Sequence, residues 1–255
     1  MRELSLFSGA GGGLLGSKIL GWETVGYVEY EPYCQKVIRQ RIADGILDAA
    51  PIFGDIRKFL SEGYADAYQG MVDIVTGGFP CQPFSVAGEG LAENDPRNMW
   101  PETIGVIRTI RPSFALLENV TGLFNHKYIR RIFGELAEGG YDARWCALSG
   151  YSIGAPVKGE RAFILAAANG INGKTWLGPL EDRAGALQQR PDFKMLREVW
   201  LQAINKNAGK HNGVADYMER GRAVGNGQIP LLLAFAYEIL SRGVVEMTPG
   251  GEGIE

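Results

Sequence analysis

Short apolar runs alternate with helix-like stretches through the first two-thirds of the sequence, and this alternation constrains the fold most strongly. Strands separated by helices pair side by side into a parallel sheet that the helices cover. We therefore predict an α/β fold with a mostly parallel sheet. The predicted strands are Glu3–Phe7, Thr24–Glu29, Pro51–Phe53, Val72–Thr76, Phe114–Glu118, Ala143–Leu148 and Ala162–Ala167.

Proline and glycine positions delimit the helices of this part. Pro32 suits the first turn of a helix, Pro112 stops the helix before it, and Gly139 closes another. The predicted helices are Gly13–Leu20, Pro32–Arg41, Arg97–Ile110 and Tyr128–Ala137.

The pattern changes beyond Ala168. Residues 169–223 are rich in Gly, Asn, Gln and charge, with one predicted helix at Phe193–Ile204. Basic residues interleave with aromatic ones there, as on nucleic-acid surfaces, although a solvated insert with a small core would look similar. The apolar stretch Ile229–Leu240 should return as a helix to the main domain. We predict a main domain of residues 1–168 and 224–255, and a small separate region at 169–223.

The composition is that of an ordinary globular protein. Of 255 residues, 45% are apolar and 22% charged, enough for a sizeable core. No apolar run approaches the ~20 residues that span a bilayer, and the first residues lack a secretory pattern, so we expect a cytoplasmic protein without a membrane partner. The net charge of −3 predicts no global attraction to nucleic acid.

The cysteines and histidines predict neither a disulfide framework nor a metal site. The three cysteines, Cys34, Cys81 and Cys146, are widely spaced, and only two histidines accompany them. No zinc-ligand spacing can be assembled from this set.

Cys81 lies in the stretch Gly77–Ser85, GGFPCQPFS, directly after an apolar strand. Open α/β sheets place ligands and chemistry at the carboxyl ends of their strands, and the flanking Pro80 and Pro83 would hold a thiol on rigid backbone. Free cysteines are also small buried hydrophobes. This residue alone leaves nucleophile and core filler equally open.

Three successive strand ends carry ligand-like features. The first strand runs into the glycine-rich turn Phe7–Gly13, which permits positive φ and close approach of a ligand but lacks the G-x-G-x-x-G spacing. Glu29 can accept hydrogen bonds from ribose hydroxyls, Tyr30 can stack on adenine, and Asp55 can accept from its amino group. Any one of these acids is more often a cap. Together they predict a nucleoside site that suits S-adenosylmethionine better than NAD.

Glu118 follows the apolar fifth strand. Partly desolvated surroundings would raise the pKa of its carboxyl and suit it to donate a proton. Because the fourth and fifth strands are expected to be neighbours, Cys81 and Glu118 should share a cleft. The alternative is that Glu118 caps the next turn.

With GGFPCQPFS, LLENV, LFSGAGGG, VEYEPY and DPRNMW in its sequence, the chain resembles the cytosine-C5 methyltransferases, which mostly modify DNA in bacteria and phages. The resemblance covers residues 3–168 and 222–242 in the family's motif order. It implies the Rossmann-like sheet of S-adenosylmethionine-dependent methyltransferases with a small target-recognition subdomain appended. In the family a variable recognition region precedes a Gly-Asn motif, here Gly225-Asn226, which places that region at 169–223.

The resemblance also implies a mechanism. The target cytosine is flipped out of the duplex, Cys81 attacks C6, Glu118 hydrogen-bonds N3, and S-adenosylmethionine methylates C5. Arg161 contacts the cytosine O2 and helps hold Cys81. The implied catalytic residues are Cys81, Gln82, Glu118, Asn119 and Arg161, with Ser85 and Lys158 as DNA contacts. The implied cofactor-lining residues are Phe7, Ala10, Gly11, Glu29, Tyr30, Asp55, Ile56, Pro80, Trp100 and Asn226.

One motif departs from the family pattern. The family's Gln-x-Arg-x-Arg appears here with Val157 in place of the Gln and Gly159 in place of the first Arg, so that only Arg161 matches. Lys158 could supply a substitute charge. Losing one charged contact costs about 1.5–3 kcal/mol, or roughly ten- to a hundredfold in rate.

The first hypothesis is therefore a DNA cytosine-C5 methyltransferase that acts on double-stranded DNA as a monomer. A cognate restriction endonuclease or a partner subunit would be its protein partner. A second hypothesis is a DNA- or cofactor-binding homologue that turns over weakly, or only with a partner. A third is a tRNA cytosine-C5 methyltransferase, although the Cys-Phe-Thr signature usual in that branch does not occur in the sequence.

Overall fold

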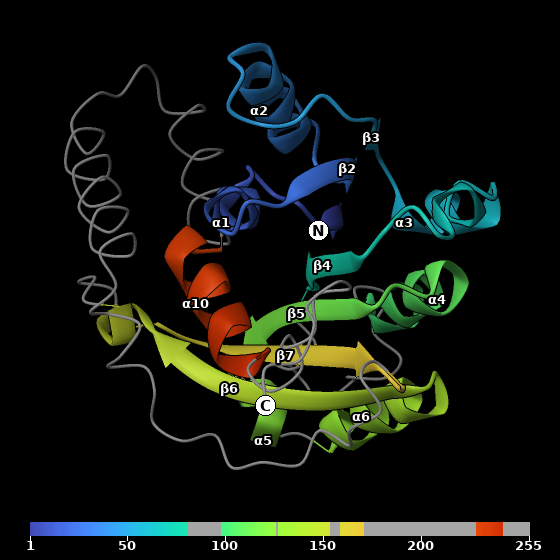
Figure 1. The fold of residues 1–255 in the computed structure, drawn as a ribbon, viewed down its shortest axis with the longest axis vertical. Helices are drawn as coiled ribbons and strands as arrows, with labels where there is room; N and C mark the ends of the chain where they lie inside the picture. Colours follow the sequence, from blue (N-terminus) through green and yellow to red (C-terminus); the bar gives the residue numbers. More distant parts are fainter. Residues whose placement is uncertain (81–97, 126, 154–158, 171–227, 242–255) are drawn as a thin grey trace, which may run out of the picture.

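The computed structural model describes residues 1–80, 98–125, 127–153, 159–170 and 228–241. These residues form a seven-stranded sheet in the order β3-β2-β1-β4-β5-β7-β6 (Figure 1). The first five strands in this order are parallel, and β7 runs antiparallel to both of its neighbours. The strands are β1 (Arg2–Leu6), β2 (Glu23–Val28), β3 (Ile52–Phe53), β4 (Ile74–Gly78), β5 (Phe114–Val120), β6 (Tyr141–Ser149) and β7 (Glu160–Ala168). The mostly parallel α/β fold is confirmed.

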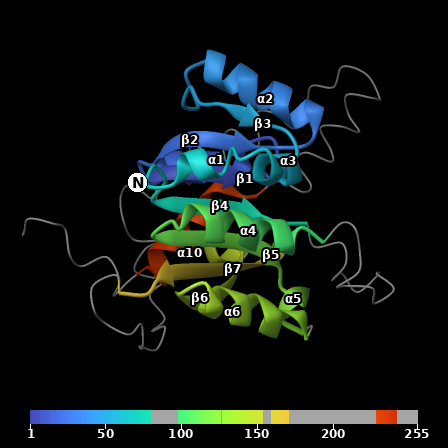
Figure 2. The same cartoon turned by 90° about the vertical axis from the view of Figure 1, so that its right-hand side faces the viewer.

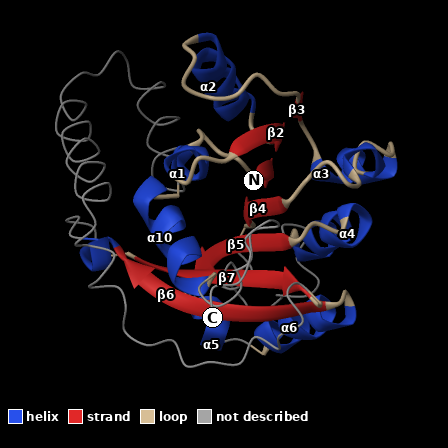
Figure 3. Ribbon diagram, viewed as in Figure 1, coloured by secondary structure: helices blue, strands red, loops and turns tan. Residues whose placement is uncertain are grey.

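Helices cover both faces of the sheet (Figures 2 and 3). On one face lie α1 (Gly12–Ile19), α2 (Pro32–Ala43) and α10 (Pro230–Leu240). On the other lie α3 (Ile56–Ser61), α4 (Trp100–Ile110) and α6 (Tyr128–Glu138). The shorter elements are the helix α5 (Gly122–Asn125) and the 3-10 turns η1 (Asp66–Tyr68) and η3 (Gly150–Ile153).

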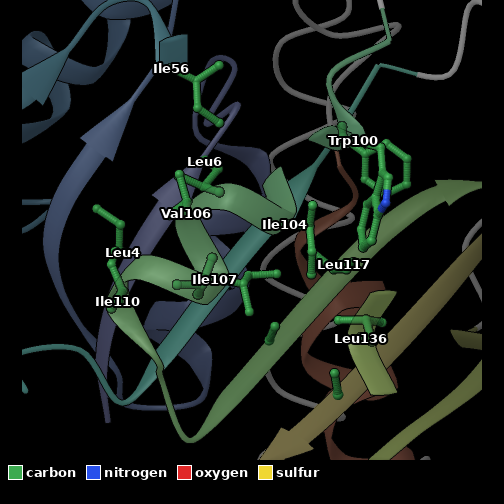
Figure 4. Close-up of a cluster of buried hydrophobic side chains, with 14 of the residues drawn as sticks. Leu4, Leu6, Ile56, Trp100, Ile104, Val106, Ile107, Ile110, Leu117 and Leu136 are labelled. Atoms are coloured by element: carbon green, nitrogen blue, oxygen red, sulfur yellow. The ribbon is translucent and has the colours of Figure 1, made fainter. Parts of the chain in front are cut away.

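The core is divided by the sheet, as the pleat of a strand requires. Along β5, Leu117 belongs to the cluster under α3, α4 and α6, whereas Leu116 belongs to the cluster under α10. Figure 4 shows part of the first cluster, in which Leu117 lies near Ile104 and Trp100. Because both faces are covered, the central strands read as continuous apolar runs instead of alternating ones.

The predicted bounds of the fourth strand were wrong at both ends. The sequence placed it at Val72–Thr76, whereas β4 spans Ile74–Gly78. The two glycines, which look like a strand terminator, continue the ladder: Gly77 pairs with Leu6 and Gly78 with Glu118. The missing side chain of Gly78 makes room for Glu118, since a Cβ on Gly78 would stand 2.9 Å from Oε2 of Glu118.

The other predicted strands and helices that fall on described residues are present, with ends shifted by a few residues. The predicted helix Phe193–Ile204 and the region 169–223, apart from its first two residues, lie outside the described residues. The division into two domains stays a prediction. Among the described residues, no helix is long and apolar enough to cross a membrane.

Candidate active site at the carboxyl edge of the sheet

The parallel strands β1 to β5 all end at one edge of the sheet, where the candidate site lies. The chain runs outward from β1 to β2 and β3 on one side and to β4 and β5 on the other. The strand order therefore reverses between β1 and β4, and ligands bind at such reversals in open α/β sheets.

The glycine-rich turn after β1 is fastened to the end of β2 by Glu29. The backbone N–H of Gly9 donates to one oxygen of the Glu29 carboxylate at 2.6 Å, and the N–H of Glu31 donates to the other at 2.7 Å. Gly9 and Gly11 have φ of +55° and +86°. Phe7 adopts a φ of +51° without being glycine, a conformation that is uncommon and concentrated at functional sites.

Burial raises the pKa of the Glu29 carboxyl, although the backbone N–H groups of Glu31 and Gly9 pull it down. The backbone N–H of Tyr30 acts on the same carboxylate. A carboxylate has about four acceptor positions, so these three backbone donors leave room for a further donor such as a hydroxyl. Glu29 thus shapes the turn through these bonds, and its role as a ribose acceptor stays a prediction.

Tyr30 and Asp55 line one cavity of about 580 Å³ at this edge. Tyr30 is 74% exposed, as an aromatic ring available for stacking would be. Asp55 also caps α3, because its Oδ1 accepts the N–H of Arg57 at 2.9 Å. The other lining residues are Phe53, Gly54, Lys58, Phe59, Glu62 and Tyr64. Ile56, predicted beside Asp55, is buried in the core.

The chain that leads to Cys81 is held by Asn119. The Asn119 side-chain nitrogen donates to the carbonyl of Phe79 at 3.1 Å, and its oxygen accepts the N–H of Val120 at 2.9 Å. The first of these bonds ties the end of β4 to the end of β5, and the second fixes the orientation of the Asn119 side chain. Pro80, the last described residue of this segment, follows directly.

Trp100 supports the same segment from the core. It is fully buried, its ring lies 5.6 Å from that of Phe79, and its indole N–H donates to Glu135 at 2.6 Å. A contact of Trp100 with a cofactor stays a prediction, and the side chain has no exposed surface in this structure.

Glu118 and Arg161 form an ion pair across β5 and β7. The Nε of Arg161 lies 2.9 Å from Oε1 of Glu118, and the two side chains are 31% and 13% exposed. Arg161 pairs in register with Val120, which puts it on the same face of the sheet as Glu118. Burial raises the pKa of the Glu118 carboxyl, even though the Arg161 charge and a hydrogen bond from Gln228 lower it. The desolvation expected for Glu118 is confirmed.

Gln228 is the residue at this site that sequence reasoning missed. It precedes α10 and hydrogen-bonds Glu118. The signal available in the sequence was a polar side chain between the Gly225-Asn226 motif and an apolar helix.

Several predicted site residues lie outside the described residues, namely Cys81, Gln82, Ser85, Lys158 and Asn226. Ala10 and Gly11 are described and lie in the turn before α1. Gly159, which departs from the family pattern, is close to Arg161, since a Cβ at that position would lie 3.7 Å from Nη1 of Arg161. Within the described ranges, no group of three or more His, Cys, Asp and Glu could hold a metal ion.

Fold and site together define a class, a doubly wound α/β protein with a candidate ligand site at its strand-order reversal and a buried acid beside it. The chain belongs to the C-5 cytosine-specific DNA methylase family, whose model matches residues 1–228. The resemblance seen in the motifs is thereby confirmed.

Similar proteins of known class support this family assignment. The chain is 34% identical over 170 residues to the type II methyltransferase M.NgoMIV of Neisseria gonorrhoeae, covering 66% of this chain and 52% of the relative. It is 33% identical over 179 residues to M.AquIA of Picosynechococcus, covering 64% of this chain and 71% of the relative. The chain spans about half the length of several of these relatives.

Solved structures show the same fold. A DNMT2 from Spodoptera frugiperda superposes with a TM-score of 0.56 at 24% identity, over 69% of this chain and 53% of that one. A Dnmt2 methyltransferase from S. pombe superposes with a TM-score of 0.54 at 24% identity, over 66% of this chain and 51% of that one. At this level of identity the likeness concerns the fold alone.

Proposed function

We propose that this chain transfers a methyl group from S-adenosylmethionine to C5 of cytosine in double-stranded DNA. The observation that carries the proposal is Glu118 on β5, a buried carboxyl whose pKa is raised. It pairs with Gly78 on β4, the strand that leads to Pro80 and Cys81. The family match and the type II methyltransferase relatives support the same reaction.

The residues at the glycine turn fit S-adenosylmethionine. Glu29 retains an acceptor position for a ribose hydroxyl, and Tyr30 and Asp55 line a cavity wide enough for a nucleobase. The positive φ angles of Gly9 and Gly11 favour glycine, so neither position carries a side chain that would keep a ligand from the backbone. When bound, the cofactor would supply the methyl group that C5 receives.

The chain's own residues would prepare the cytosine for that transfer. The Cys81 thiolate attacks C6, forming a carbon–sulfur bond and pushing electron density toward N3 and C5. Protonated Glu118 donates to N3, which offsets the negative charge that develops on the ring. After C5 carries the methyl group, its proton leaves and the carbon–sulfur bond breaks, which releases Cys81. The base must be flipped out for any of these steps, because its reactive carbons are inaccessible in the stack.

Arg161 and Asn119 would position the two groups that act on the cytosine, the Glu118 carboxyl and the Cys81 thiol. Arg161 lies 2.9 Å from Glu118, and it would contact the O2 of a cytosine whose N3 meets that carboxyl. Asn119 fixes the backbone at Phe79, two positions before Cys81. A thiol nucleophile depends on such placement, since misplacement by about 1 Å can cost a hundredfold in rate.

The recognition of DNA is assigned to residues 169–223, with Gln82, Ser85 and Lys158 as further contacts at the active site. We propose that the protein works in the cytoplasm on DNA as a monomer. A cognate restriction endonuclease or partner subunit is consistent with the type II names of the relatives.

A weakened homologue is the second candidate, and Gly159 favours it. A side chain at that position would lie against the Arg161 guanidinium, so the glycine removes one contact from Arg161. Such a protein would bind DNA and cofactor but turn over slowly.

The test is methyl transfer from labelled S-adenosylmethionine to duplex DNA, with tRNA as a parallel substrate. We expect label in DNA, no label with Cys81→Ser, and normal label with Cys146→Ser, which changes a cysteine outside the site. A covalent adduct with duplex DNA containing 5-fluorocytosine would exclude a homologue that binds DNA without reacting, because trapping requires both the attack on C6 and the methyl transfer; label that enters DNA only slowly would instead favour the weakened homologue. Label in tRNA but not DNA, or no label in either, would contradict the proposal.

A further inference from the structure

Gln228 contacts three glycines, two at the start of α1 and one at the end of β4. A Cβ on Gly12 would collide with the Gln228 carbonyl oxygen, and a Cβ on Gly13 would collide with its side-chain oxygen. A Cβ on Gly78 would stand 2.8 Å from its side-chain nitrogen. The glutamine therefore fills space that these glycines leave open between the start of α1 and the end of β4.

The same side chain reaches Glu118. The Gln228 amide hydrogen-bonds the Glu118 carboxyl, and a Cβ on Gly78 would meet both Oε2 of Glu118 and the Gln228 nitrogen, at 2.9 and 2.8 Å. The two polar groups thus meet above Gly78. Arg161 approaches the other carboxylate oxygen, Oε1.

The position of Gln228 is set by α10. This helix begins two residues later at Pro230, and its apolar side chains are almost all buried. It packs so closely on α1 that a Cβ on Gly16 would lie 2.5 Å from the Pro230 carbonyl oxygen. A side chain anchored by a buried helix loses little further freedom when it holds another group.

We propose that Gln228 is a positioning residue for the reaction, whose amide holds the Glu118 carboxyl over Gly78 while Arg161 holds it from β7. The inference rests on the proposed function, in which Glu118 must meet N3 of the cytosine. It assigns a task to a residue outside the motif set predicted from the sequence.

The hydrogen bond from Gln228 should shift the pKa of Glu118 in one direction only. Among the described residues, Arg161 on β7 is the charged group acting on Glu118, while β4 presents Gly78 and the start of α1 presents Gly12 and Gly13. An amide N–H that donates to a carboxylate stabilises the charged form and lowers its pKa. Removing only this donor should raise the pKa of Glu118.

The deciding variant is Gln228→Met, which keeps the length of the side chain and has no N–H to donate. Gln40→Leu, on the exposed face of α2, is the matched control. The first measurement is the pKa of Glu118, followed by carbon-13 NMR of labelled glutamate carboxyls and assigned with Glu118→Gln. The second is the pH dependence of kcat for DNA methylation.

We expect Gln228→Met to raise the pKa of Glu118, to lower kcat about tenfold and to move the alkaline limb of kcat to higher pH. Gln40→Leu should leave all three unchanged. A merely structural role of Gln228 would lower kcat without moving that limb.

The outcomes separate this inference from the proposed function. An unchanged Glu118 pKa in Gln228→Met overturns the inference whatever the activity. Unchanged kcat and limb in an active enzyme also overturn it, with the function intact. A raised pKa in a protein whose wild type is inert on DNA overturns the proposed function instead.

Discussion

The Arg161 guanidinium lies 2.9 Å from the Glu118 carboxylate across the antiparallel pair of β5 and β7. The positive charge opposes the effect of burial, which raises the pKa of Glu118. The two effects act on the group that must carry a proton in the proposed reaction. Arg161 therefore limits the range of pH over which Glu118 stays protonated.

Replacing Arg161 by Met should raise the pKa of Glu118 further, because the charge that stabilises the carboxylate is lost. The alkaline limb of kcat should move to higher pH, while kcat itself falls roughly ten- to a hundredfold through the lost contact. A pH series of initial rates measures both. Arg161→Lys keeps the charge and should keep the limb near its wild-type position; a shift equal to that of Arg161→Met would contradict the electrostatic cause.

Gly78→Ala should abolish most activity while the protein remains folded. The added methyl would stand 2.8 Å from the Gln228 nitrogen and 2.9 Å from Oε2 of Glu118, closer than such contacts allow. Gly134→Ala is the matched control, since its site on α6 is open and alanine favours a helix by up to about 1 kcal/mol. Methylation rates and urea unfolding distinguish the two; an active Gly78→Ala protein would show that the contact above Gly78 is dispensable.

Glu3 should make stability depend on pH. It is fully buried on β1 and accepts hydrogen bonds from Ser17, Thr24 and Thr76. Burial raises its pKa, so the folded state holds the proton more tightly than the unfolded chain. The stability that this proton contributes is fully present below about pH 4.3, the ordinary glutamate value, and is lost as pH rises through the raised folded value.

Glu3→Gln should remove that loss. Urea unfolding of wild type and variant from pH 4 to pH 8 gives the measurement, and the difference in free energy of unfolding should shift in favour of the variant as pH rises. Glu23→Gln, on the exposed start of β2, serves as the control. A pH-independent difference between Glu3→Gln and wild type would contradict the prediction.

Tyr30→Ala should weaken cofactor binding. The ring is 74% exposed and lines the same cavity as Asp55, so its loss removes a stacking surface worth about 1–3 kcal/mol per base. Calorimetry with S-adenosylmethionine in the absence of DNA should show a Kd about ten- to a hundredfold higher. Tyr151→Ala, which changes another exposed tyrosine, should bind as wild type does. Equal affinity of all three proteins would remove Tyr30 from the cofactor site.

The sequence predicted the strands because a buried parallel sheet demands continuous apolar runs, and such runs are visible without any structure. It missed α3, whose six residues are too few for a periodic pattern, and it took the glycines of β4 for a strand end. Both errors have a local cause, since a short helix and an internal glycine carry weak signals in a single chain.

The residue types at the candidate site were likewise determined by the sequence, since Glu29 and Asp55 each follow a recognisable strand and Glu118 lies near the end of one. Which groups touch was decided by the tertiary structure alone. The contacts of Glu118 with Arg161 and Gln228 join segments far apart along the chain, and they arise because β7 lies beside β5 and α10 packs on α1. The charge balance at Glu118 depends on these contacts, because a pKa responds to burial and to neighbours in space, which no spacing along the sequence encodes.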